Sequence, residues 1–276
     1  MLIDELHTKG LLPNVPEAVL AGTRYLTVMG STAYGINTDS SDIDLYGFAI
    51  PPLDEIYPHM GGHIVGFDPT PVSFTQWQQH HINDADTGTS YDISIHGIVQ
   101  YFVLCAKNNP NMIDSTFTAD RHVVHRTPIS DHVRQNRKLY LSKRVRDTFM
   151  GYAVKQYRKL DKLDDTSNAK RRRDVETYGY DTKKLYHTVR LLDEAEQILT
   201  TGDLDLQRNS AQLTQIRQGE WSFDYIHKWF EAKMKRVDSV ASTCKLPDEP
   251  DYNAIRTILL DCLEMHFGVV PNIIIR

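Results

Sequence analysis

Two neighbouring stretches decide the fold: YLTVMGSTAYG at residues 25–35 and SDID at residues 41–44. The first begins with a β-rich run that ends at Gly30-Ser31, the pattern of a strand followed by a turn. The second opens an alternating run over residues 42–50, which stops at a pair of prolines and is also typical of a strand. The early part of the chain is therefore predicted to be α/β, with a glycine turn directly after a strand.

The second stretch carries two carboxylates. Asp42 and Asp44 stand two residues apart, so in a strand their side chains point to the same face. Two such carboxylates repel each other unless a cation lies between them, and oxygen ligands of this kind suit Mg²⁺ or Mn²⁺. A third carboxylate, Asp92, lies in another alternating run at residues 91–95 and would join them if the two strands are neighbours.

Simpler explanations exist for the two aspartates. Many Asp-x-Asp pairs are ordinary surface residues of strands or turns. A calcium loop is a more specific competitor, because Asp42, Asp44 and Gly47 match its first, third and sixth positions. The twelfth position is Leu53, where that loop needs a bidentate Glu, so the calcium interpretation fails.

The ordered combination of Gly30-Ser31, Asp42-x-Asp44 and Asp92 resembles the DNA polymerase beta nucleotidyltransferase superfamily. The fuller string, Gly-Ser-x-x-Tyr-Gly followed by Ser-Asp-Ile-Asp, resembles the RNA-repair-pathway DNA polymerase beta family. Later pieces are also similar, and the resemblance runs from about residue 25 to about residue 205. They are Asn109-Pro110-Asn111, Gly151-Tyr152-Ala153 with Gln156, and Gly179-Tyr180-Asp181. One departure is Asp114, where we expect a Glu.

The resemblance implies the transfer of a nucleoside monophosphate from an NTP to a hydroxyl, with release of pyrophosphate. Asp42 and Asp44 would hold two Mg²⁺ or Mn²⁺ ions, and Asp92 would bind the catalytic ion and help deprotonate the acceptor. The nucleotide contacts expected near the first strands are Gly30, Ser31, Tyr34 and Ser41.

A second set of nucleotide contacts is expected on a later helix. Lys184, His187 and Arg190 are spaced by three, so on a helix they lie roughly on one side and would contact the triphosphate. A solvated helix face explains the same spacing, and the adjacent Lys183 is able to replace Lys184.

Charge is distributed unevenly along the chain. The net charge is −5, yet residues 134–173 hold 14 Lys and Arg against 4 Asp and Glu. Such a basic stretch suggests a polyanionic partner, although solvated helices explain it equally well. Within it, Lys170, Arg171, Arg172 and Arg173 are the candidate RNA contacts.

The predicted architecture is a nucleotidyltransferase domain with a short mixed sheet at residues 20–130, followed by a mostly helical domain at residues 131–276 that closes the nucleotide cleft. Helices are expected at residues 98–106, 131–141, 146–163, 182–200, 223–240 and 253–267, and a loop at residues 164–173. The apolar residues 269–276 are predicted to form either a strand that packs back on a domain or an exposed edge used in oligomerisation.

Composition excludes several classes of protein. No apolar run approaches the length of a membrane span, the N-terminus does not read as a signal peptide, and three scattered cysteines predict free thiols in the cytoplasm. The histidine pairs His80-His81 and His122-x-x-His125 lack a completing ligand, so zinc is not expected.

The expected partners are an NTP and an RNA, with a tRNA or a damaged RNA end as the leading acceptor. A protein or small-molecule hydroxyl would use the same chemistry. A non-catalytic nucleotide-binding regulator and an RNA-binding scaffold are the non-enzymatic alternatives.

Overall fold

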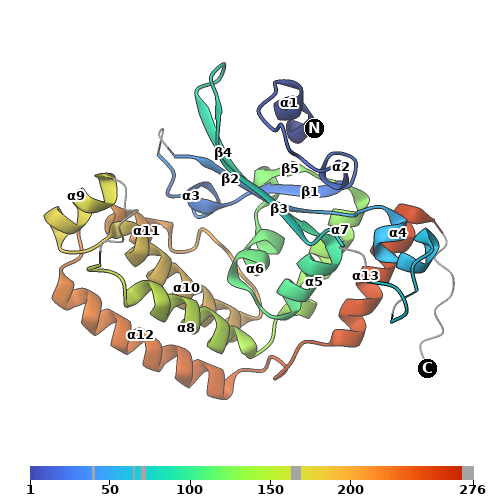
Figure 1. The fold of residues 1–276 in the computed structure, drawn as a ribbon. Coiled ribbons are helices and arrows are strands. Elements are labelled where there is room, and N and C mark those ends of the chain that lie inside the picture. The colour runs from blue at the N-terminus through green and yellow to red at the C-terminus, as the bar shows by residue number, and fades with distance from the viewer. Residues whose placement is uncertain (39–40, 65, 70–72, 163–168, 269–276) are drawn as a thin grey trace.

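The computed structural model describes residues 1–38, 41–64, 66–69, 73–162 and 169–268 (Figure 1). Its described part contains a five-stranded mixed sheet with the strand order β3-β4-β2-β1-β5. β1 runs antiparallel to β2 and β5, β2 runs parallel to β4, and β3 runs antiparallel to β4. The strands are β1 (Thr23–Val28), β2 (Ile43–Ala49), β3 (Gln76–Asp84), β4 (Thr89–Gly97) and β5 (Val123–His125).

The helices follow and flank these strands. They are α1 (Leu2–Thr8), α2 (Glu17–Leu20), α3 (Gly30–Ala33), α4 (Leu53–Ile56), α5 (Ile98–Ala106), α6 (Pro110–Phe117), α7 (Pro128–Gln135), α8 (Arg144–Tyr157), α9 (Ala169–Tyr178), α10 (Thr182–Thr201), α11 (Ser210–Arg217), α12 (Phe223–Thr243) and α13 (Tyr252–Phe267). Short 3₁₀ turns occupy Pro58–Gly61, Asp120–His122 and Arg137–Tyr140.

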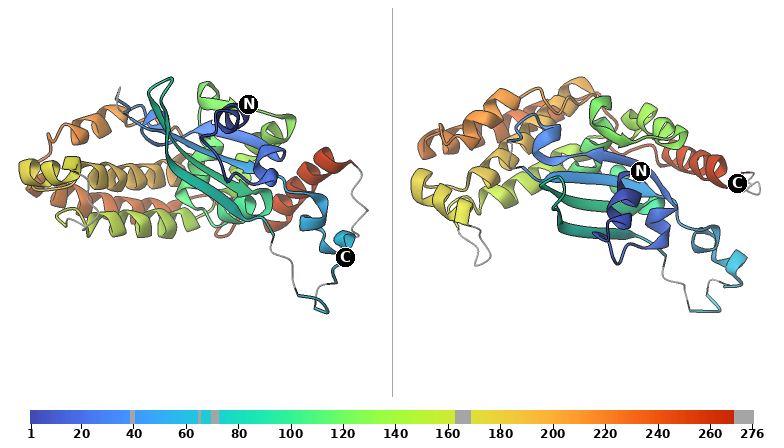
Figure 2. Two further views of the ribbon diagram at one scale, coloured as in Figure 1. Left: turned by 45° about the horizontal axis from the view of Figure 1, so that its top comes forward. Right: turned by 90° about the horizontal axis from the view of Figure 1, so that it is seen from above.

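Alternation along the strands divides the core into two layers. Leu26, Leu45 and Ile93 are buried on one face with residues of α1 and α2. Tyr25 and Phe48 are buried on the opposite face, against the helical part of the molecule. The strands predicted at residues 25–29, 42–50 and 91–95 are therefore confirmed. Figure 2 shows the N-terminal helix on one side of the sheet and the long helices on the other.

Strand β3 was not predicted, because its sequence QWQQHHIND is almost entirely polar. It lies at the edge of the sheet, where most of its side chains remain exposed or half-buried. An edge strand needs fewer apolar residues than a central one, so the alternation that identifies strands is weak there.

Helix α10 packs against both α8 and α12 and contacts α9 and α11 as well, so it is the central helix of the helical layer. Asp181 caps its N-terminus by accepting a hydrogen bond from the Lys184 N–H, and Gly202 ends it in the left-handed conformation. The predicted apolar stripe of this helix is confirmed, since all its members are buried in one cluster: Leu185, Val189, Leu192, Ala195, Ile198 and Leu199.

Two helix predictions need correction. The helix expected at residues 131–141 begins earlier, at Pro128, because Thr127 and Ser130 form a capping box, and it ends at Gln135 before a short 3₁₀ turn. The loop expected at residues 164–173 is partly helix, because α9 begins at Ala169. Residues 163–168 lie outside the described part of the chain.

The domain boundary expected between residues 130 and 131 stays a prediction. The larger apolar cluster crosses it, from Tyr25 and Phe48 of the sheet to Val189 and Leu192 of α10. Helix α13 returns to pack against α5 and α7.

All three cysteines are free. None of the helices in the described ranges is both long and apolar enough to cross a bilayer. Residues 269–276 lie outside the described part.

Candidate active site

The parallel pairing of β2 and β4 places Asp44 directly opposite Asp92. Residues in register on neighbouring strands share a face, and here that face also carries Tyr46 and Phe48, which pack toward the helical layer. Asp42 lies just before β2. All three carboxylates line one cavity of about 280 Å³, so the strand adjacency on which the third carboxylate depended is present.

Gly30 allows the turn after β1 to approach these carboxylates. Its φ is +62°, and a Cβ at this position would lie 1.7 Å from Oδ2 of Asp44. The backbone N–H of Met29 also donates a hydrogen bond to the Asp44 carbonyl at 2.7 Å. Only glycine satisfies both the conformation and the contact. The turn and the carboxylate are thus fixed against each other.

Charge repulsion is evident at Asp44. Burial raises the pKa of its carboxyl; Asp92 and Asp42 raise it further, whereas Lys183 and His80 oppose the change. A cation among these carboxylates would relieve the repulsion, and their oxygen atoms are ligands that Mg²⁺ and Mn²⁺ accept. The donor set therefore fits such an ion.

The third carboxylate is held toward a β-bulge. Pairing between β3 and β4 is interrupted at Gln79–Ile82, and His81 adopts a φ of +56°. Its backbone N–H donates to Oδ1 of Asp92 at 2.7 Å, and Nδ1 of His80 lies 3.5 Å from Oδ2. Within the described ranges, no three His, Cys, Asp or Glu side chains gather as a metal-binding group. The three carboxylates line one cavity but are not drawn together into a ligand set in this conformation.

The cavity around the three carboxylates, here called the carboxylate pocket, also contains cations and hydroxyls. Its lining residues are Ser31, Thr38, Ser41, Asp42, Asp44, Asp92, Arg171, Asp174, Thr182, Lys183, Tyr186 and Arg217. The predicted Ser31 and Ser41 are thus present with three basic side chains, from α9, α10 and α11. Cations and carboxylates in one cavity suit a polyanion accompanied by metal ions.

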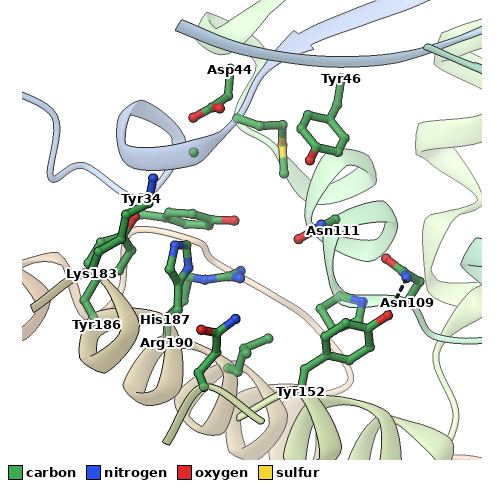
Figure 3. A pocket seen from close by; sticks show the side chains of 15 residues that line it. Tyr34, Asp44, Tyr46, Asn109, Asn111, Tyr152, Lys183, Tyr186, His187 and Arg190 are labelled. Carbon is green, nitrogen blue, oxygen red and sulfur yellow. Dashed lines mark hydrogen bonds between the residues drawn. The ribbon is translucent and has the colours of Figure 1, made fainter. Parts of the chain in front are cut away.

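A second cavity of about 300 Å³ adjoins the first, and we call it the amide pocket (Figure 3). It shares Asp44, Lys183 and Tyr186 with the carboxylate pocket, so the two are adjacent lobes of one groove. Its lining residues are Met29, Gly30, Tyr34, Asp44, Tyr46, Asn109, Pro110, Asn111, Tyr152, Gln156, Lys183, Tyr186, His187, Arg190 and Leu191. Two of the later pieces of the family resemblance thus meet here, Asn109-Pro110-Asn111 and Tyr152 with Gln156, whereas Gly179-Tyr180-Asp181 lines neither pocket.

The expectation for Lys184 is corrected. Its Nζ donates to the Lys162 carbonyl at 2.8 Å and lies 3.7 Å from Asp181, and it lines neither pocket. Lys183 lines both. Each helical residue turns by about 100°, so Lys183, His187 and Arg190 face opposite the buried stripe, whereas Lys184 turns aside. The position of the apolar stripe around the helix could therefore have identified Lys183, rather than Lys184, from the sequence.

Arg190 is buried among acidic groups and reaches the amide pocket only with part of its surface. Its Nη1 pairs with Asp114 and lies 3.0 Å from Glu194, and its guanidinium stacks over the Tyr34 ring at 4.3 Å. The Tyr34 hydroxyl donates to Asp114 at 2.9 Å. Tyr34 and Arg190 were both expected to contact the nucleotide. In the structure their polar groups instead bind Asp114 and Glu194 in this buried cluster.

Burial of the cluster changes its titration. Burial alone would lower the pKa of Arg190, but Glu194 and Asp114 outweigh it and raise that pKa. The pKa of Glu194 is raised well above its usual range, chiefly by burial. His187, beside the cluster, has a strongly lowered pKa because of burial and the neighbouring cations Arg190 and Lys183. His187 is therefore neutral at pH 7.

The basic stretch divides into two parts. Arg134 is buried, and Lys143, Arg144 and Arg146 pair with Asp248, Glu249 and Asp238. These basic side chains are paired within the protein and line neither pocket.

The other half surrounds the groove. Arg171 lines the carboxylate pocket, and Arg172 and Arg173 are exposed on α9. The side chain of Lys170 lies outside the described part. Arg217, from α11, was not expected from the sequence. It lines the carboxylate pocket, and its Nη1 donates to the Ile36 carbonyl at 2.8 Å.

Comparison with known proteins identifies the family of this chain. The RNA repair pathway DNA polymerase beta family model matches residues 12–261. No curated protein matches the chain significantly. Among solved structures, the chain is similar to a nucleotidyltransferase-like protein from Exiguobacterium sibiricum 255-15, with 8% identity and a TM-score of 0.31, covering 93% of this chain and 74% of that one. Because the family model spans most of the sequence, this chain belongs to the RNA repair pathway DNA polymerase beta family and is a nucleotidyltransferase.

Proposed function

We propose that this nucleotidyltransferase moves a nucleoside monophosphate from an NTP to the 3′ hydroxyl of an RNA, a tRNA or a damaged RNA end, and releases pyrophosphate. The observation that carries the proposal is the register of Asp44 with Asp92. This register brings two carboxylates to one cavity, together with Asp42 and three basic side chains.

Two Mg²⁺ or Mn²⁺ ions, held by Asp42, Asp44 and Asp92, would neutralise the phosphate charge and lower the pKa of the attacking hydroxyl. Ser31 and the basic side chains of Lys183 and Arg217 bind the terminal phosphates. Asp92 accepts the proton of the acceptor hydroxyl. Displacement at the α-phosphorus then needs positioning and charge neutralisation, without a covalent enzyme intermediate.

An RNA acceptor is supported by the family and by the exposed basic residues of two helices. Arg158 and Lys159 follow α8, whose Tyr152 and Gln156 line the amide pocket, and Arg172 and Arg173 lie on α9. Cations on the elements that frame the groove would bind the phosphates of the acceptor strand.

A transfer assay with the full chain tests the proposal. Each α-labelled NTP is mixed with Mg²⁺ or Mn²⁺ and with bulk tRNA, a short RNA or no acceptor. We expect label on RNA from the wild type, none without divalent ions, and none from Asp44→Asn. The matched control is Asp54→Asn, which removes an exposed aspartate of α4.

Other results would contradict parts of the proposal. Label on the protein itself would make a protein hydroxyl the acceptor. RNA labelling that persists in Asp44→Asn would show that the Asp44 carboxylate is not needed for the reaction. Absence of both labelling and NTP binding would overturn the function as a whole.

A further inference from the structure

The amide pocket contains two side-chain amides without a protein partner. Asn111 is exposed on α6 and Gln156 is half-buried on α8, and both line the cavity. In the part of the chain that the structure describes, neither amide makes a hydrogen bond within the protein. Asn109 differs, because its Oδ1 accepts from the Met112 N–H and its Nδ2 donates to the Tyr152 hydroxyl, both at 3.4 Å. Two of the three amides are thus available to a ligand.

Flat rings stand beside these amides. Figure 3 shows Tyr46, Asn111 and Tyr152 on one side of the cavity and His187 and Arg190 on the other. An amide presents a donor and an acceptor side by side, the pattern found on the edges of nucleobases, and aromatic rings stack on their faces. The cavity therefore offers both means by which proteins recognise a base.

The charges of the groove indicate which part of a nucleotide lies in each lobe. Arg171, Lys183 and Arg217 line the carboxylate pocket, where a triphosphate gains most from them. In the amide pocket, Arg190 is already balanced by Asp114 and Glu194. Asp44 and Lys183 belong to both lobes, so they mark the boundary. The uncharged end of the nucleotide is the part that suits the amide pocket, and about 300 Å³ lies at the lower end of the usual range for small-molecule sites.

We infer that the amide pocket binds the base of the incoming NTP and that Asn111 and Gln156 determine which base is accepted. This inference rests on the proposed function, because it assigns a subsite to the same nucleotide. Hydrogen bonds that are lost with the wrong base leave the amides or the base edge unpaired, which is the physical origin of the selection.

Binding measurements without RNA test the inference. The affinities of the full chain for ATP, GTP, CTP, UTP and inorganic tripolyphosphate are measured in Mg²⁺ for the wild type, Asn111→Leu and Gln156→Met. Both substitutions keep the approximate side-chain size and remove the amide. Gln100→Met, which changes a half-buried glutamine of α5 outside both pockets, is the matched control.

We expect the wild type to bind one NTP about tenfold or more tightly than the least favoured one. In both amide variants this ratio should approach one, while the affinity for tripolyphosphate and the behaviour of Gln100→Met stay at the wild-type level. Unchanged selectivity in the amide variants overturns the inference, as does equal wild-type binding of all four NTPs. Wild-type failure to bind either NTPs or tripolyphosphate instead contradicts the proposed function.

Discussion

The carboxylate pocket and the buried cluster of Tyr34, Asp114, Arg190 and Glu194 are built from the same kinds of side chain and differ in whether the charged groups are buried against each other or line an open cavity. In the buried cluster, a guanidinium is paired with two carboxylates and a ring. In the carboxylate pocket, four aspartates and three basic side chains line a cavity that remains open to ligands. The comparison teaches that charges paired in the interior hold the groove in shape, whereas charges that line a cavity stay accessible to a ligand.

The largest predicted effect is a loss of transfer activity when a charge is removed from the carboxylate pocket. We expect Asp44→Asn to reduce transfer about a thousandfold or more, because loss of ion binding removes several kcal/mol of transition-state stabilisation. Its free energy of unfolding should be unchanged or slightly higher, since burial and the neighbouring carboxylates raise the pKa of Asp44 and so disfavour its ionised form. Single-turnover rates and urea unfolding measure the two quantities. A strongly destabilised Asp44→Asn would show that this pocket, too, is structural.

Stability should respond in the other region. Asp114→Asn leaves Arg190 with one of its two buried acidic partners, so we expect a loss of about 3 kcal/mol in the free energy of unfolding. Urea unfolding of the variant beside Asp54→Asn checks the value. A stable but inactive Asp114→Asn would contradict the structural role given to this cluster.

A third substitution tests how closely the glycine turn is fitted to Asp44. Gly30→Ala combines a positive φ with a Cβ that overlaps the Asp44 carboxylate, so we expect a stability loss of about 2 kcal/mol together with reduced transfer. Gly88→Ala is the matched control, because Gly88 has a similar φ of +68° but open space around its Cβ. Equal behaviour of the two variants in unfolding and transfer would mean that only backbone strain matters.

The pH dependence of stability should report His187. Its pKa is lowered in the folded chain, so below about pH 6.5 the unfolded chain binds a proton that the folded chain does not. Stability is therefore lost as the pH falls. Between pH 7.5 and 5.5 the wild type should lose about 1 kcal/mol more than His187→Gln. If the wild type and His187→Gln lose the same free energy of unfolding between the two pH values, His187 takes up its proton in the folded state as well.

The smallest effect concerns the two halves of the basic stretch. Replacing both Arg172 and Arg173 by Ala should weaken RNA binding and reduce the salt dependence of log K by about 0.7 for each lost phosphate contact. Replacing both Lys143 and Arg144 by Ala removes the same charge from groups already paired with Asp248 and Glu249, and should leave the salt slope unchanged. Titrations at several salt concentrations decide this, and identical slopes for both double variants would exclude α9 as an RNA contact.

Local patterns predicted the parts of the site that lie within single elements. The alternation around Asp44 and Asp92 identified two strands, and the apolar stripe identified α10. Which strands pair, and which turn of a helix faces a cavity, depends on tertiary packing. Lys183 was therefore only an alternative to Lys184, and nothing near Arg217 marked it.

The structural partner of Arg190 was equally hidden. Asp114 was noticed only as a departure from the expected Glu, and its contact with Tyr34 and Arg190 joins residues 80 and 76 positions apart. Strand β3 gave too little apolar alternation to be recognised. The sequence thus predicted which carboxylates meet in one cavity better than it predicted the scaffold that supports them.

The bulge at His80 and His81 has a consequence beyond the position of Asp92. Strand β3 is an edge of the sheet, and a regular nine-residue edge offers its unpaired backbone groups to a strand of another molecule. The extra residue breaks that template near its middle. Trp77 and Gln79 before the bulge and Ile82 after it lie on the same face of the sheet, so deleting His81 would restore an even ladder without turning the side chains over. The same two residues thus orient a carboxylate and interrupt the regular edge on which a strand of another molecule would pair.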